Sequence, residues 1–177
     1  NQYGAQIGVA GGMAGSGNRE PTRPKTGIHE KNKKEDGMKQ SQKLLLTWLI
    51  ENAGLFSKIE KYITPEDFTE EIYRKVAEIL FGQFRDTGGV NPAQIVSMFQ
   101  NEEEQREIAG LFNARIHQVE TKEDREKALK ETIIRVKQNS MEYHAKAASP
   151  TDMAALQKMV ADKRALEELE KVHISVD

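Results

Sequence analysis

Large apolar side chains recur every three to four residues from about residue 41 onward. This spacing places them on one face of an α-helix and predicts amphipathic helices. Ser41 precedes the first such stripe and can serve as its N-cap, and a turn over residues 52–54 follows it. The members of this first stripe are Leu44, Leu45, Trp48 and Leu49.

The same pattern predicts four further short helices before residue 119. One spans residues 55–63, and the next carries a stripe that ends at Gly88 and Gly89. Asn91 can cap the third of these helices, with Pro92 at its first position. The stretch "EEEQREIAGLFNARI" forms the last one, and its acidic start suits a helix N-terminus. No stretch alternates as a strand would. Residues 41–119 are therefore expected to form a compact bundle of short helices.

In residues 120–177 the predicted helices are longer and their apolar stripes are narrower. A helix of more than 20 residues begins near Thr121, and its apolar stripe is narrow and interrupted by Ser140. Ser149 and Pro150 break the pattern, and a second helix restarts with Ser149 or Thr151 as its cap. We expect these two helices to form an antiparallel hairpin, so the predicted fold class is all-α.

The first 40 residues contain eight of the 13 glycines and no run of large apolar side chains. Such a segment cannot bury enough surface to offset its ordering entropy, so residues 1–40 are expected to form a flexible linker. They carry 7 Lys and Arg against 4 Asp and Glu, whereas residues 122–177 carry 11 of each. We therefore expect no direct nucleic-acid binding by the hairpin, and a solvated linker rather than a nucleic-acid contact in the basic segment.

Candidate chemistry is sparse. The chain has no cysteine, its four histidines (His29, His117, His144, His173) lack metal-ligand spacing, and no phosphate-binding or nucleophile motif occurs. We expect no catalytic residue, no metal and no cofactor. No apolar run approaches the length of roughly 20 residues that a membrane span needs. Together with the lack of cysteine, this fits a cytoplasmic protein that does not bind membranes.

The order of these elements carries a family resemblance. "QKLLLTWLIENAGLFSKIEKYITPEDFTEEIYRKVAEIL", a glycine turn and then "VNPAQIVSMF" resemble the C-terminal helicase-binding domain of the bacterial DnaG-type replicative primase. The N-terminal domain of the DnaB-type helicase is also similar. The linker ahead of the bundle, the early end after the hairpin and the lack of a motor motif favour the primase.

The resemblance implies a protein-interaction module rather than an enzyme. It would dock a DNA primase onto the amino-terminal collar of the hexameric replicative helicase, couple primer synthesis to unwinding, and modulate helicase activity. In the family the hairpin is the main binding element. The expected partner-binding residues are therefore apolar hairpin side chains: Tyr143, Leu156, Leu166, Leu169, Val172 and Ile174. Leu156 and Leu169 could equally hold the two hairpin helices together.

Two alternatives remain open from the sequence. A helicase collar domain would self-associate, and a nucleic-acid-binding helical domain would use the basic linker and lose affinity steeply with salt.

The stretch "ITPEDF" (residues 63–68) is interpreted as structural rather than as a binding loop. Thr64 can cap a helical turn, Pro65 suits its first position, and Asp67 can reach back as the capping partner. Phe68 is expected to anchor the following helix in the core.

Overall fold

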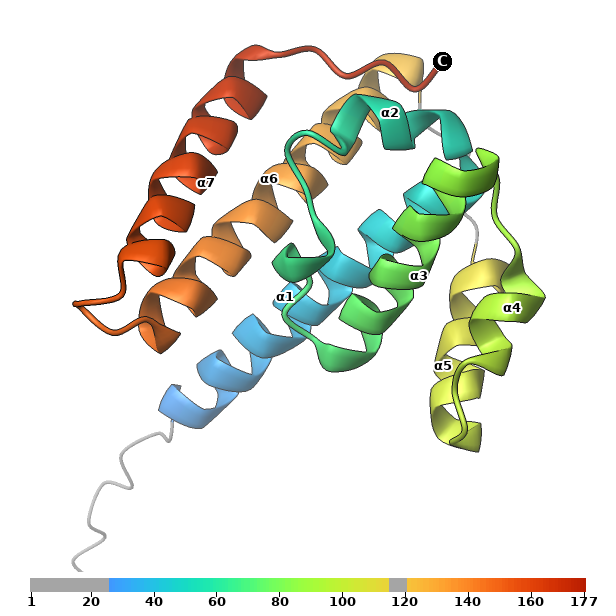
Figure 1. Cartoon of the computed structure of the whole chain (residues 1–177), viewed down its shortest axis with the longest axis horizontal. Coiled ribbons are helices and arrows are strands. Elements are labelled where there is room, and N and C mark those ends of the chain that lie inside the picture. Colours follow the sequence, from blue (N-terminus) through green and yellow to red (C-terminus); the bar gives the residue numbers. More distant parts are fainter. Residues whose placement is uncertain (1–25, 115–120) are drawn as a thin grey trace, which may run out of the picture.

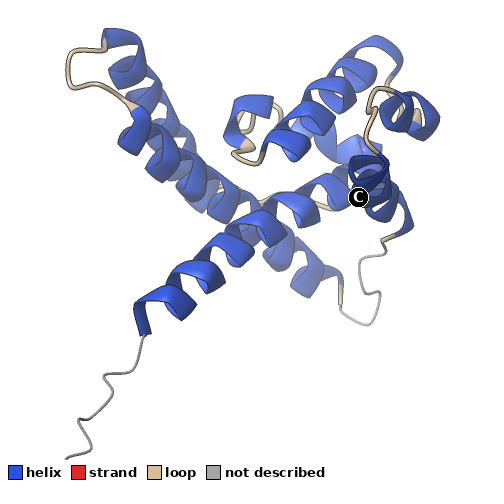
Figure 2. Cartoon of the chain, turned by 90° about the horizontal axis from the view of Figure 1, so that it is seen from below, coloured by secondary structure: helices blue, strands red, loops and turns tan. Residues whose placement is uncertain are grey.

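The protein is described by a computed structural model that places residues 26–114 and 121–177, with side chains from residue 33 onward. Over these residues the secondary structure is entirely helical (Figures 1 and 2). The α-helices are α1 (Thr26–Glu51), α2 (Phe56–Ile59), α3 (Glu71–Thr87), α4 (Pro92–Ser97), α5 (Glu102–Asn113), α6 (Lys122–Ala147) and α7 (Met153–Lys171). Two 3₁₀ turns, η1 (Ala53–Leu55) and η2 (Pro65–Asp67), flank α2. The predicted all-α bundle with a C-terminal helical hairpin is confirmed.

One continuous apolar core lies beneath these helices. The second half of α1 supplies Leu45, Leu46 and Leu49, all fully buried. Three rings from different segments meet beside it: Phe56 contacts Phe81 edge-on with centroids 5.1 Å apart, and Phe68 contacts the same ring at 6.5 Å. Such edge-to-face pairs add stabilisation beyond the apolar area that they bury. Phe68 thus anchors α3 as the sequence predicts.

Several helix ends are those that the sequence predicts. Gly88 ends α3 in the left-handed region, with φ of 71°. Asn91 caps α4 by accepting a hydrogen bond from the amide of Gln94, and Pro92 is the first residue of that helix. Thr121 likewise caps α6. These ends satisfy backbone groups that a helix terminus leaves without intrahelical partners.

The linker prediction is wrong over residues 26–40, which belong to α1. Ser41 is therefore an interior residue and not a cap, and its hydroxyl donates to the carbonyl oxygen of Gly37 at 2.8 Å. Residues 26–40 lack an apolar stripe, yet they contain no proline, and most of them tolerate a helix. A search for amphipathic periodicity cannot detect a helical segment that lacks an apolar stripe. The remaining linker residues, 1–25, lie outside the described residues.

The hairpin is not a separate unit from the bundle. Figure 1 shows α6 between α7 and α1, with α4 and α5 on the far side of the molecule. Leu129, Ile133 and Val136 of α6 belong to the same buried cluster as the side chains of α1. The cap of α7 is Asp152 rather than Ser149 or Thr151, and it accepts a hydrogen bond from the amide of Ala155 at 3.1 Å. The predicted junction near residue 119 lies outside the described residues.

Candidate interaction surface

The outer face of α7 carries a row of exposed apolar side chains. Met153, Leu156 and Val160 are 67%, 43% and 54% exposed, and their spacing of three and four residues puts them on one side of the helix. A shallow hollow runs along this row, completed by Gln157, Ala161 and Arg164. We call this row the α7 surface. Large apolar residues gathered on one exposed face are typical of protein-interaction sites.

The opposite face of α7 is fixed against the rest of the molecule. Leu169 is fully buried, Asp162 is nearly so, and Ala165 packs against the core. This inner face determines which side of α7 points outward. The α7 surface is therefore held in place by the chain itself.

The six predicted partner-binding residues fall into three groups. Tyr143 and Leu156 are exposed, while Leu166 and Val172 are half-buried. Leu169 and Ile174 are buried, which is a correction, because neither offers a surface to a partner in this conformation. The exposed pair lies in two places: Leu156 belongs to the α7 surface, whereas Tyr143 lines a separate cleft on α6.

Ile174 is buried because the segment after α7 turns back onto the bundle. Its backbone is held at Val176, whose amide donates to Glu126 Oε1 at 3.2 Å and whose carbonyl accepts from Asn52 Nδ2 at 2.7 Å. Lys58 Nζ also donates to the carbonyl of Ser175, at 2.9 Å. Through the tail, these contacts join the start of η1, α2 and α6. Helical periodicity carried no information about them because the tail is not helical.

A buried polar network lies between the bundle and the hairpin. Asp67 is fully buried at the end of η2, where its carboxylate accepts from Ser140 Oγ at 2.7 Å and pairs with Lys137 Nζ at 3.2 Å. Lys137 Nζ also pairs with Asp162 of α7 at 2.8 Å, and Asp162 in turn lies 3.4 Å from Lys158 Nζ. Buried charges are tolerated only where they are paired and hydrogen-bonded in this way.

Asp67 also performs the local task predicted for it. The amide of Thr64 donates to Asp67 Oδ2 at 2.9 Å, so the carboxylate does close the turn. The sequence interpretation missed its long-range partners, which lie 70 and 73 residues away. The one signal in the sequence was Ser140, a polar residue within the apolar stripe of α6, because a polar position there needs a polar partner.

A side-chain hydrogen bond joins α3 to α5. The Tyr73 hydroxyl donates to the Glu107 carboxylate, and the Tyr73 side chain is fully buried. Burial raises the pKa of Tyr73, and the hydrogen bond and negative charge of Glu107 raise it further. The tyrosine is therefore held neutral and serves as a structural donor.

Among the described side chains, those of residues 33–114 and 121–177, no three His, Asp or Glu residues cluster so as to hold a metal ion. None of the described helices is long and apolar enough to cross a membrane.

Comparison with known proteins adds no relative: no family model, curated protein or solved structure matches this chain.

Proposed function

We propose that this chain is a docking module that attaches a DNA primase to the amino-terminal collar of a hexameric replicative helicase. The single observation that carries the proposal is the α7 surface, where Met153, Leu156 and Val160 lie exposed on the hairpin. The order of sequence elements that resembles the primase domain suggests the identity of the partner. In that family the hairpin is the element that binds.

The α7 surface has the composition expected of a binding site's centre. Three flexible or branched apolar side chains would be desolvated together, and Arg164 at the edge of the hollow could form a polar rim contact. A few such buried residues contribute most of the free energy of binding in protein interfaces. The buried Asp67–Lys137–Asp162 network fixes α7 beforehand, so that less ordering entropy would be lost on binding.

Attachment of this kind works through effective concentration. A primase held at the helicase collar meets newly separated single strands at a far higher local concentration than a free enzyme would. Binding alone is enough for this role, so no catalytic group is required of the chain. Modulation of helicase activity by the bundle would follow from the same contact.

The test is the affinity of the whole chain for the hexameric helicase, measured by calorimetry. The double variant Leu156→Asp/Val160→Asp should weaken binding by more than about tenfold, since it places two charges in a desolvated contact. Met98→Asp is the matched control, because Met98 is 64% exposed on the far side of the molecule, after α4. Equal binding by both variants would refute the proposal.

The helicase-collar alternative has its own measurement. Sedimentation of the chain alone at micromolar concentrations should show a monomer. Self-association that the Leu156→Asp/Val160→Asp change abolishes would instead identify the α7 surface as a contact between copies of this chain.

A further inference from the structure

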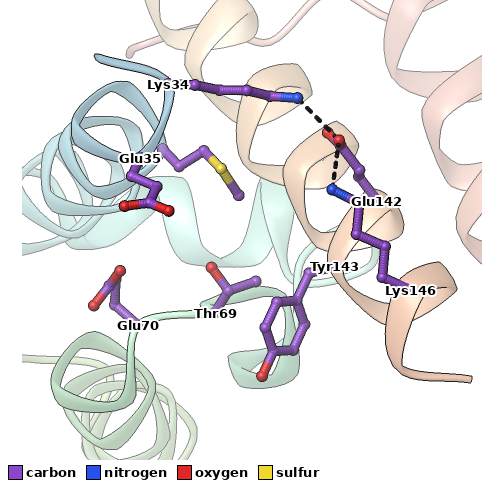
Figure 3. Close-up of a pocket in the computed structure, with 8 residues that line it drawn as sticks. Lys34, Glu35, Thr69, Glu70, Glu142, Tyr143 and Lys146 are labelled. Atoms are coloured by element: carbon purple, nitrogen blue, oxygen red, sulfur yellow. Dashed lines mark hydrogen bonds and ion pairs between the residues drawn. The ribbon is translucent and has the colours of Figure 1, made fainter. Parts of the chain in front are cut away.

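A cleft lies where α1, the loop between η2 and α3, and α6 come together (Figure 3). It holds about 320 Å³ and is separate from the α7 surface. Three segments line it, so its shape depends on the packing of the hairpin against the bundle. The lining residues are Lys34, Glu35, Met38, Thr69, Glu70, Glu142, Tyr143 and Lys146.

The positive charges of the cleft are already paired. Glu142 accepts hydrogen bonds from Lys34 Nζ at 2.9 Å and from Lys146 Nζ at 3.2 Å (Figure 3). These two bonds and the charges behind them hold the pKa of Glu142 below its usual range. Both lysines are thus occupied on the α6 side of the cleft.

The opposite side carries two carboxylates of a different kind. Figure 3 shows Glu35 and Glu70 together, across the cleft from the Lys34–Glu142–Lys146 group. Among the described residues, no Lys, Arg or His nitrogen lies within 4 Å of either carboxylate. Lys39, one turn along α1 from Glu35, lies instead over the ring of Tyr73, with Nζ 6.0 Å from its centroid.

The loop that bears Glu70 is held in position by α1. The side chain of buried Gln42 accepts a hydrogen bond from the Glu70 amide at 3.0 Å and donates one to Thr69 Oγ1 at 2.8 Å. Both the nitrogen and the oxygen of the Gln42 side-chain amide bond to this loop. The backbone that carries Glu70 is therefore held in place at the edge of the cleft.

Between the two sides lies an apolar surface. Tyr143 is 48% exposed, and its ring meets that of His144 edge-on, with centroids 5.4 Å apart. Met38 contributes a half-buried thioether to the same cleft. An aromatic ring beside two carboxylates that no described cation contacts matches a group that is both planar and positively charged.

We propose that this cleft binds an arginine side chain presented by a peptide segment of a protein partner. The guanidinium would stack on Tyr143 and donate hydrogen bonds to Glu35 and Glu70, since its fork of donors suits carboxylates. The site goes beyond the proposed helicase contact, because it uses another face of the molecule and does not depend on the α7 surface. Residues of both the bundle and the hairpin line the site, so the affinity for a ligand would also depend on how the two pack together.

The probe is the capped tripeptide acetyl-Gly-Arg-Gly-amide, titrated into the ¹⁵N-labelled whole chain and followed by NMR. We expect saturable shifts in the millimolar range that centre on Thr69, Glu70 and Tyr143. The citrulline analogue, which has nearly the same shape without the charge, should produce none. Equal shifts with citrulline, or no saturable shifts with arginine, would overturn the proposal.

Two double variants separate the site from general charge attraction. Glu35→Gln/Glu70→Gln should weaken binding of the arginine peptide by about fivefold or more, as loss of partly exposed ion pairs predicts. Glu71→Gln/Glu78→Gln also removes two negative charges, but from the exposed face of α3 outside the cleft, and should leave the affinity for the arginine peptide unchanged. Equal weakening by both variants would show nonspecific attraction and contradict the site.

Discussion

At the scale of single residues, Asp67 has the widest consequences. It sits in a six-residue stretch whose composition indicates only a capped turn, and it does close that turn. Yet the same carboxylate holds Lys137 and Ser140 of α6, and through Lys137 it reaches Asp162 of α7. One side chain therefore links local backbone geometry to the packing of the hairpin on the bundle.

Replacing Lys137 by alanine should be strongly destabilising. The change removes the buried cation between Asp67 and Asp162 and leaves them only the partly exposed Lys158, at 4.0 and 3.4 Å. Breaking a buried pair in this way costs about 3–5 kcal/mol. Urea unfolding followed by circular dichroism measures the loss. The matched control is Lys34→Ala, which removes an exposed pair with Glu142 and should cost at most about 1 kcal/mol. Similar losses in both variants would mean that the network contributes no more than a surface ion pair.

Tyr73 should make stability depend on alkaline pH. The folded state holds the tyrosine proton more tightly than the unfolded state does, because its pKa is raised on folding. The contribution is complete below the ordinary tyrosine pKa of about 10 and is lost as the pH rises above it, where only the unfolded chain releases the proton. Tyr73→Phe should accordingly show a smaller fall in unfolding free energy above that pH. An unchanged slope would show that Tyr73 does not titrate differently in the two states.

At the scale of elements, the helices form where apolar periodicity and caps agree, and two cases depart from the prediction. α1 extends 15 residues before Ser41, because residues that tolerate a helix can extend it without an apolar stripe. The tail after α7 packs without any regular secondary structure, through Ile174, Val176 and backbone hydrogen bonds to side chains. The α1 extension rests on residue propensity and the tail on tertiary contacts, and neither produces apolar periodicity in the sequence.

The turn between α3 and α4 offers a clean test of a backbone effect. Gly88 has φ of 71°, and a Cβ added there would meet no atom within 4 Å, so only backbone strain opposes a side chain. Gly88→Ala should lower the unfolding free energy by about 1–2 kcal/mol. The adjacent Gly89 also has open space and lacks the positive φ, so Gly89→Ala should be nearly neutral. Equal effects of the two changes would contradict a requirement for glycine at position 88.

At the scale of the whole molecule, the bundle and the hairpin share one apolar core and present the α7 surface and the cleft beside Tyr143 to solvent. The sequence sufficed for the fold class and for most helix boundaries, because periodicity and capping are local properties. It could not separate exposed Tyr143 and Leu156 from buried Leu169 and Ile174, since all four are apolar residues of the same segment. Which of them faces solvent depends on α1 and on the returning tail, and neither is visible in the hairpin's own sequence.

The central claim is that the α7 surface contacts the collar of a replicative helicase. A photo-crosslinking residue placed at position 160 in the whole chain tests that contact most directly, with position 98 as the control for an equally exposed apolar site. After irradiation with the hexameric helicase, position 160 should become joined to the amino-terminal collar and position 98 should not. Crosslinks from position 98 alone, or none from position 160 under conditions of saturating helicase, would contradict the account.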